Sequence, residues 1–281
     1  MLLSIDIISA FQTMLHYQFM QHAFEAGTVV AIVAGIMGYL VVLRKSSFAA
    51  HAFAEIGFAG AAGAVLIGVS PVLGLLTFSM LSGVGIAVLG NRATQRDVEI
   101  GTILAFTLGL GVLFISLYTG YATEAYSILF GEILGISSGD VLLTLVVSFI
   151  IMAVAAIVYR PLLFASLDEE VAEAKGMRTL KLGIIFMILL AASVSIAVQV
   201  VGVLLIFALM VTPAAIAIRL TSKPVFAVTL SVLIALLSTW IGIFISFYEP
   251  YPVSFFITSI VFALYLIVRF IYPSVRNFGA N

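Results

Sequence analysis

Long apolar segments separated by short polar breaks make up most of this chain. Nine such segments run at about 24–43, 48–69, 72–89, 100–118, 141–159, 182–198, 200–218, 225–247 and 255–271. Each is close to the roughly 20 residues that an α-helix needs to cross a bilayer, and none alternates apolar and polar residues as a membrane β-strand does. The pattern therefore predicts an all-α polytopic membrane protein.

Two neighbouring segments leave the number of transmembrane helices open between eight and nine. Only Gln199 separates the segment that ends at Val198 from the one that begins at Val200. With nine spans and the N-terminus outside, all twelve Lys and Arg residues fall on one side of the membrane. The other side carries acidic residues only: Asp6, Glu25, Glu124, Glu132, Asp140 and Glu249. By the positive-inside rule the basic side, with the C-terminus, is cytoplasmic, and this clean separation of charge favours nine spans.

The composition agrees with a membrane protein. Hydrophobic residues make up 63% of the 281 residues and charged residues only 9%, whereas an average soluble domain is about 25% charged. We expect one transmembrane domain over residues 1–281. The absence of cysteine excludes disulfides and thiolate metal sites. The stretch up to Gly27 lacks the basic region and cleavage site of a signal peptide, so we expect it to stay in the mature chain as an interfacial helix.

The segment HAFAE, from His51 to Glu55, places two ionisable groups in an otherwise apolar span. Residues four apart share one face of a helix, and Glu55 would lie roughly 12–15 Å from the cytoplasmic end of its span, near mid-bilayer. An imidazole and a carboxylate suit Zn, Mn or Fe(II), and an unpaired carboxylate at that depth is costly. We predict that His51 and Glu55 bind a divalent metal in a transport pathway; a structural hydrogen-bonded pair is the alternative.

Other polar residues give weaker signals. Two groups of residues at the expected outer surface can attract cations. Ordinary surface charge explains them as well. The groups are His16, His22 and Glu25 at the outer end of the first span, and Glu124, Glu132 and Asp140 in an outer loop. Gln199 is expected to make a hydrogen bond between helices. Pro213 is expected to bend its helix.

The longest connection on the basic side covers residues 161–181, and its middle predicts a short helix. Ser166 is the expected N-cap, with Glu169 three positions on, and Gly176 ends the helix. Apolar side chains beside acidic ones on an exposed helix favour docking of a cytoplasmic partner over a solvated loop. The residues expected at this contact are Ala165, Ser166, Leu167, Asp168, Glu169, Glu170, Val171, Ala172 and Gly176.

Five stretches, taken in order, resemble the permeases of the zinc, manganese and iron class of ABC importers. They are QFMQHAFEAG, GIMGYLVVLRKSSFAAHAFAEIGFAG, RDVEIGTILAFTLGLGVLFISL, RPLLFASLDEEVAEAKG and VGVLLIFALMVTPAAIAIRL. Many members of this family carry an aspartate and, four residues later, a histidine, in a stretch such as GDALSHA. The matching positions here are His51 and Glu55, so the resemblance implies that this pair holds the metal, with imidazole and carboxylate in reversed order.

The resemblance also implies the fold and the partners. The fold is that of a type II ABC-importer permease in the cytoplasmic membrane of a prokaryote. Two copies of the permease work with two cytoplasmic ATPase subunits and an extracytoplasmic metal-binding protein, and FASLDEEVAEAKG is the coupling helix that enters a groove of the ATPase. ATP hydrolysis then belongs to the partner, in agreement with the lack of a Gly-rich loop ending in Gly-Lys-Ser/Thr. This chain is expected to bind no cofactor and to carry zinc, manganese or iron.

Three other functions are weighed against a metal-importing permease. A permease for iron chelates or a cobalamin-like cofactor shares the architecture, but its large cargo does not need a close His/Glu pair. A proton-coupled secondary transporter would use the pair as a proton relay, yet such transporters often contain internal repeats, and the two halves of this chain share no convincing one. A membrane enzyme is disfavoured because the chain has only three histidines and no dense acidic cluster.

Overall fold

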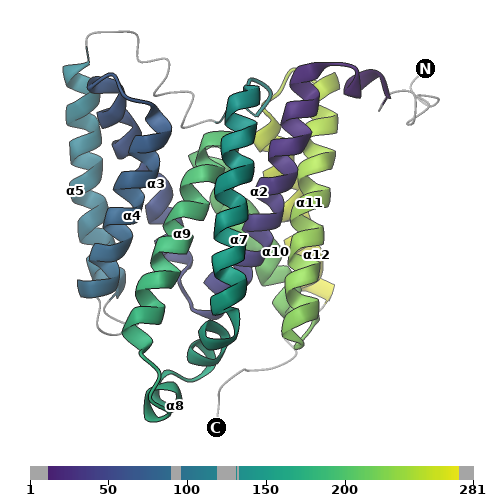
Figure 1. Ribbon diagram of the computed structural model, residues 1–281. Helices are drawn as coiled ribbons and strands as arrows, with labels where there is room; N and C mark the ends of the chain where they lie inside the picture. Colours follow the sequence, from purple (N-terminus) through teal and green to yellow (C-terminus); the bar gives the residue numbers. More distant parts are fainter. Residues whose placement is uncertain (1–11, 90–95, 119–130, 132, 272–281) are drawn as a thin grey trace.

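A computed structural model describes residues 12–89, 96–118, 131 and 133–271 of the chain (Figure 1). Its helices are α2 (Gln18–Leu43), α3 (Ser47–Leu66), α4 (Pro71–Leu89), α5 (Arg96–Leu117), α7 (Ser138–Leu167), α8 (Glu169–Ala174), α9 (Thr179–Val201), α10 (Val203–Leu220), α11 (Pro224–Tyr248) and α12 (Val253–Ile271). All of these except α8 are long and apolar enough to cross a membrane, which makes nine spans within these residues. The all-α polytopic fold and the count of nine are thereby confirmed.

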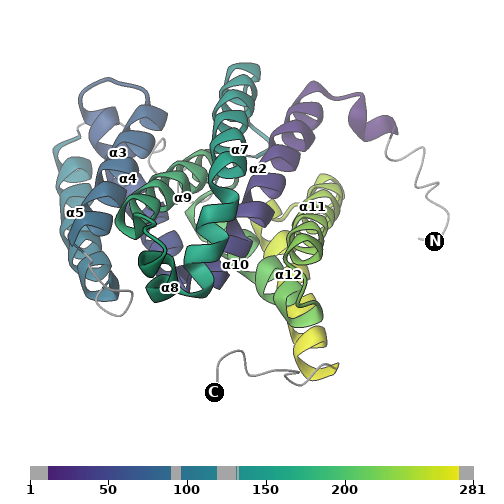
Figure 2. The same cartoon turned by 60° about the horizontal axis from the view of Figure 1, so that its bottom comes forward.

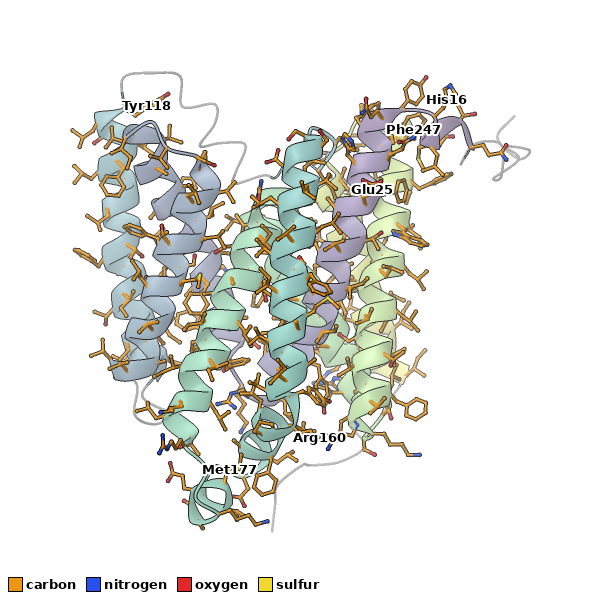
Figure 3. All side chains as sticks on the ribbon, viewed as in Figure 1. His16, Glu25, Tyr118, Arg160, Met177 and Phe247 are labelled. Atoms are coloured by element: carbon orange, nitrogen blue, oxygen red, sulfur yellow. The ribbon has the colours of Figure 1, made fainter. Side chains whose placement is uncertain are left out.

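The two ends of the bundle keep the charge separation that the sequence predicts. Successive long helices run in opposite directions (Figure 1). Arg160 and Met177 lie at the end that carries α8, called the α8 end below, and Glu25 lies at the opposite end (Figure 3). Because the helices alternate, the turns after α2 and α10, which contain Lys45 and Lys223, also lie at the α8 end.

Helix α7 extends further than its hydropathy predicts. The apolar segment ends at Tyr159, but the helix continues through Pro161 to Leu167. Proline is tolerated there because neighbouring helices support the backbone of a membrane helix. The connection predicted over residues 161–181 therefore begins within α7, and α9 starts before its end, at Thr179.

A single residue, Gly202, joins α9 to α10. Its φ of 83° and ψ of 163° belong to a region of backbone conformation that is open almost only to glycine. Gln199 lies in the last turn of α9, so the junction that left eight or nine spans open consists of two complete helices. Helix α10 is continuous through Pro213, and the bend predicted there stays a prediction.

The turn between α2 and α3 is short and closely hydrogen-bonded. The Lys45 N–H donates to the Val42 carbonyl at 3.2 Å, and the Ser46 N–H donates to the Val41 carbonyl at 2.9 Å. Lys45 has a left-handed φ of 53°, which completes a Schellman motif. The Ser46 hydroxyl also donates to the Arg44 carbonyl at 3.2 Å. These bonds fix the start of α3 relative to the end of α2.

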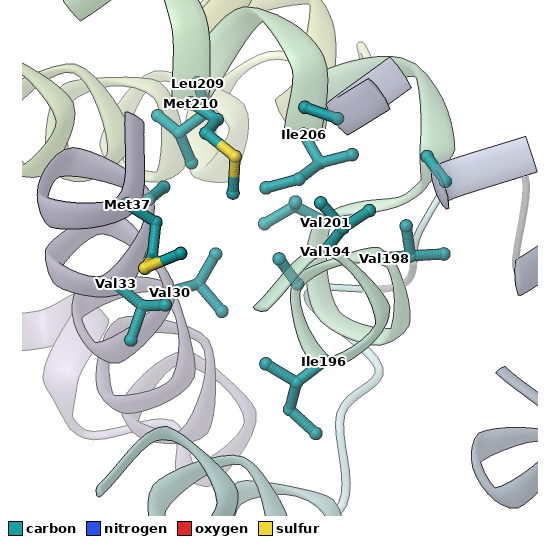
Figure 4. Close-up of a cluster of buried hydrophobic side chains, with 14 of the residues drawn as sticks. Val30, Val33, Met37, Val194, Ile196, Val198, Val201, Ile206, Leu209 and Met210 are labelled. Carbon is teal, nitrogen blue, oxygen red and sulfur yellow. The ribbon is translucent and has the colours of Figure 1, made fainter. Parts of the chain in front are cut away.

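Helices α2, α9 and α10 form the centre of the bundle, and α9 is buried on almost every side. Figure 4 shows the central cluster of buried side chains, which includes Val30, Val33, Met37, Val194, Ile196, Val198, Val201, Ile206, Leu209 and Met210. Helices α5 and α12 lie at the periphery, and few of their side chains are buried within the chain. Their open faces are available to lipid or to another protein chain.

Glycines bring pairs of helices into backbone contact. A Cβ atom on Gly60 of α3 would lie 2.3 Å from the carbonyl oxygen of Gly74 in α4, and a Cβ on Gly74 would lie 2.1 Å from that of Gly60. Helices α2 and α10 meet in the same way, since a Cβ on Gly38 would lie 1.9 Å from the carbonyl oxygen of Met210. Close packing of this kind drives association of membrane helices, because lipid provides no hydrophobic force between them.

Two glycine-to-alanine changes are expected to differ in their effect on stability. Gly60→Ala forces a methyl group against Gly74 and destabilises the protein by about 1–3 kcal/mol through overpacking. Gly109→Ala in α5 meets open space and has little effect, because alanine favours the helix. Thermal unfolding in detergent measures both variants, and equal melting temperatures would contradict the close α3–α4 contact.

Candidate functional site

His51 and Glu55 lie one turn apart on α3, as their spacing predicts. The distance between His51 Nε2 and Glu55 Oε1 is 3.2 Å. The two side chains are 44% and 29% exposed, so this chain does not enclose them. The structure thus brings the predicted pair together on a face of α3 that remains open.

The other face of α3 packs against α4. The Ser79 hydroxyl of α4 donates to the carbonyl of Phe53 at 3.2 Å, and Gly60 makes the backbone contact described above. At 3.6 residues per turn, His51 and Glu55 point roughly opposite to Phe53. The tight α3–α4 contact therefore provides a rigid support behind the pair.

Phe207 of α10 packs against the imidazole of His51. The two ring centroids are 5.4 Å apart and the planes meet at 68°, an edge-to-face geometry. Phe207 is itself 38% exposed, so it borders the same open face. The sequence could not identify this contact, because Phe207 is one apolar residue among many and lies far from His51 along the chain.

The separation of the two polar atoms suits a shared metal ion. Ligand atoms about 2.1 Å from a metal lie about 3.0 Å apart at a right angle and about 3.4 Å apart at the tetrahedral angle; the 3.2 Å observed lies between these values. Among the described residues, no group of three or more His, Asp or Glu side chains could hold a metal. These described residues therefore offer one imidazole and one carboxylate, and a metal ion bound by the pair would need further ligands from water or another molecule.

The residues considered for cation binding at the outer surface do not form a metal site within the described chain. His16 and Glu25 are exposed at the end opposite α8 (Figure 3). His22 Nδ1 lies 3.3 Å from the Ile136 carbonyl and so links α2 to the start of α7. Two more of these residues lie outside the described part of the chain: Glu124 and Glu132.

Asp140 binds Gln199 across the α7–α9 contact. Gln199 Nε2 donates to Asp140 Oδ1 at 2.9 Å, and the Ser137 hydroxyl donates to Oδ2 at 2.5 Å. Each carboxylate oxygen thus has a donor, and the start of α7 is held to the end of α9. The interhelical hydrogen bond predicted for Gln199 is confirmed.

Helix α8 is capped by Asp168. Its Oδ1 accepts a hydrogen bond from the Val171 N–H at 2.9 Å, and Gly176, with a φ of 78°, follows the helix. The prediction of Ser166 as N-cap is wrong, because α7 continues through Pro161 and keeps Ser166 in its last turn.

The exposed surface formed by α8 and the last residue of α7, called the outward surface of α8 below, is partly apolar. Leu167 is 64% exposed and Val171 is 42% exposed, with Glu170 exposed beside them. Two residues of the predicted partner contact, Ala165 and Ala172, are buried inside this chain. The side chain of Glu169 lies outside the described part of the structure. Exposed leucine and valine next to a carboxylate are typical of a surface that meets another protein.

A pocket of about 590 Å³ lies at the end opposite α8. Its lining is mostly apolar and includes Ile133, Val201, Leu204, Ser246 and Tyr251. No local sequence pattern indicates this pocket, because its walls come from separate segments that meet only in the fold. Among the residues that the structure describes, no charged side chain lines this pocket.

The Asp140–Gln199 hydrogen bond predicts a loss of stability when its donor is removed. Gln199→Ala leaves the half-buried carboxylate without its α9 partner and destabilises the protein by about 1–3 kcal/mol. Asp140→Asn keeps an acceptor for Gln199 and serves as the matched control. Thermal unfolding measures both, and a Gln199→Ala melting temperature equal to that of the wild type would contradict a structural role for the bond.

Comparisons with known proteins agree with this architecture. The sequence model of the ABC 3 transport family matches residues 16–272. The manganese import system permease protein ScaB of Streptococcus gordonii is 31% identical over 263 residues, covering 92% of this chain and 94% of the relative. The manganese transport system membrane protein MntC of Listeria monocytogenes is 30% identical over 235 residues, covering 83% and 84%.

Among solved structures, the chain is similar to PsaBC from Streptococcus pneumoniae in complex with Fab. The TM-score is 0.84 at 29% identity, and the match covers 95% of this chain and 96% of the other. The resemblance in sequence thus extends to the path of the backbone over nearly the whole length. This chain is a multi-pass membrane permease and belongs to the ABC 3 transport family.

Proposed function

We propose that this chain is the permease subunit of an ABC importer that carries a divalent metal ion across the cytoplasmic membrane. The observation that carries the proposal is the His51–Glu55 pair, 3.2 Å apart on the open face of a membrane helix. Imidazole and carboxylate together suit manganese, zinc and iron(II). The relatives named as manganese transport proteins make manganese the first candidate.

A second copy of the chain would complete the metal site. The carboxylate of Glu55 is costly against lipid, so the open face of α3 requires a protein partner or a water-filled path. A twofold axis beside α3 would bring two imidazoles and two carboxylates to one ion. Together with water, these groups make a sufficient ligand set without cysteine.

The α8 end faces the cytoplasm in this proposal, as the positive-inside rule requires, and the N-terminus lies outside. Leu167 and Val171 of each permease dock on one of two ATPase subunits, which hydrolyse the ATP. A separate extracytoplasmic binding protein delivers the metal to the opposite end. The permease itself contributes the pathway and no nucleotide site.

The alternative functions explain fewer of these features. A permease for a bulky metal chelate has no need of two ligating side chains within 3.2 Å of each other. A proton-coupled secondary transporter could use the pair as a relay, but it leaves the exposed Leu167 and Val171 without a partner.

Both members of the pair are expected to be essential for uptake. In proteoliposomes that hold the complex with its ATPase and binding protein, His51→Ala and Glu55→Gln lower ATP-driven metal uptake by about tenfold or more, because each removes one of few ligands. Manganese, zinc and iron(II) are offered together, and the metal content of the vesicles is measured by mass spectrometry.

His22→Ala and Glu25→Gln are the matched controls, since they remove the same chemical groups from α2 at the opposite end of the bundle. They are expected to transport as the wild type does. Wild-type uptake by both His51→Ala and Glu55→Gln would assign the pair a structural role and refute the metal pathway at α3. A loss confined to the two control variants would move the metal site to the outer surface.

A charge on the outward surface of α8 is expected to release the ATPase. Leu167→Asp and Val171→Asp place a carboxylate in an apolar contact and lower co-purification of the ATPase about tenfold or more. Ser222→Asp, in the exposed turn between α10 and α11, adds the same charge at the same end and is the control. Equal recovery of the ATPase with all three variants would rule out docking through α8.

A further inference from the structure

Arg44, at the end of α2, contacts both of the helices that flank α8. Its Nη1 donates a hydrogen bond to the Ser166 hydroxyl in the last turn of α7 at 3.0 Å. Its Cζ lies 4.9 Å from the ring centre of Phe186 in α9, and that ring is fully buried. One guanidinium therefore joins the helix that leads into α8 to the helix that leaves it.

Helix α8 is attached to the same two helices. Figure 2, which brings the α8 end forward, shows α8 beside the ends of α7 and α9. Lys175 Nζ lies 4.8 Å from the ring centre of Phe164 in α7. On the other side, the Thr179 hydroxyl of α9 donates to Glu173 Oε1 of α8 at 2.6 Å. A displacement of α8 therefore pulls on the end of α7 and on the start of α9.

Helix α7 can bend just before this attachment. Pro161 has no N–H, so the Ile157 carbonyl lacks its helical donor, and a helix kinks most easily at such a point. The segment 162–167, which contains Ser166, follows directly. It can tilt with α8 while the rest of α7 stays in place.

On the C-terminal side of Arg44, only a short, hydrogen-bonded turn separates this residue from the helix that carries the candidate metal site. The Schellman turn at Lys45 leads straight into α3 at Ser47, and His51 lies in the second turn of that helix. A movement of the Arg44 side chain and its turn therefore carries the start of α3 with it.

From these contacts we propose that Arg44 is a positioning residue that transmits movement of α8 to the His51–Glu55 pair. The inference rests on the proposed function, because it takes α8 to be the contact with the ATPase. When the ATPase shifts α8, the last turn of α7 moves Ser166, Arg44 follows, and α3 changes the direction in which the pair faces the pathway. The metal is thereby held or released in step with the nucleotide.

The chemistry requires arginine at this position. The planar guanidinium can donate to a hydroxyl with one nitrogen and lie against an aromatic ring with its face. A lysine ammonium is a compact point charge and cannot keep both contacts. Arg44→Lys therefore keeps the positive charge and removes the planar guanidinium, so it tests the shape of the side chain apart from its charge.

The test uses the complete complex in proteoliposomes and measures metal ions taken up per ATP hydrolysed. Arg44→Lys is expected to assemble and to hydrolyse ATP as the wild type does, while uptake per ATP falls about three- to thirtyfold. Ser166→Ala lowers the ratio in the same direction by a smaller factor, because the contact with Phe186 remains. Lys45→Gln removes a neighbouring charge from the same turn and leaves the ratio unchanged.

A purely structural role for Arg44 gives a different result. A contact that only holds helices together lowers the melting temperature or the yield of complex, but the complex that does assemble transports with the wild-type ratio. A wild-type ratio of metal uptake to ATP hydrolysis in the assembled Arg44→Lys complex would overturn the proposal. If Arg44→Lys does not assemble, Ser166→Ala decides in the same way, because it removes only a hydroxyl.

A second measurement does not depend on metal binding. The chain has no cysteine, so Phe48→Cys, at an exposed position in the first turn of α3, introduces the only thiol of this chain. Its alkylation, read as a mass shift of this chain, is expected to change when the ATPase is trapped with ATP and vanadate, and Arg44→Lys abolishes the change. A nucleotide response that persists in Arg44→Lys, or none in the Phe48→Cys background alone, refutes the inference.

These outcomes are independent of the proposed metal site. If His51→Ala and Glu55→Gln transport normally, the metal pathway is refuted, whereas the response of Phe48→Cys still reports whether Arg44 links α8 to α3. If the pair is essential but the thiol response ignores Arg44, the proposed function holds and the link is refuted.

Discussion

Hydrocarbon offers no hydrogen bonds, and this constraint shapes the whole molecule. The backbone answers it by forming helices, which satisfy their own donors and acceptors. Several polar side chains within the bundle answer it by bonding across helices, as Ser195 of α9 does to the Leu75 carbonyl and Ser231 of α11 to the Gly35 carbonyl. By the same constraint, the imidazole and the carboxylate on the open face of α3 need polar partners that the described part of this single chain does not supply, such as water or another protein chain.

The bundle combines a stiff part with a part that can move. Backbone contact at Gly60 and Gly74 packs α3 tightly against α4, so we expect the helix that carries His51 and Glu55 to move as a rigid body. The α8 end is built differently, from a helix that contains a proline, a six-residue helix and contacts made by single side chains. A transporter needs both properties, because a site that deforms loses its ion and a site that never moves cannot release it.

Local patterns in the sequence predicted much of this, whereas contacts between distant segments were out of reach. Hydropathy located all nine spans, since burial in lipid acts on each segment separately, and helical periodicity alone placed His51 beside Glu55. The end of α7 was missed because proline usually ends a helix in water but not where packed neighbours support the backbone. The contacts Arg44–Ser166 and His51–Phe207 join residues far apart in the chain, and no local rule connects them.

The one-residue junction at Gly202 has a consequence for biogenesis. A loop of ordinary length lets two neighbouring helices enter the bilayer one after the other, with the first already in place. Helices α9 and α10 have no such loop, so nothing between them can remain outside while the second is still being made. They must insert together as one helical hairpin, and the most buried helix of the bundle reaches its place only with its neighbour.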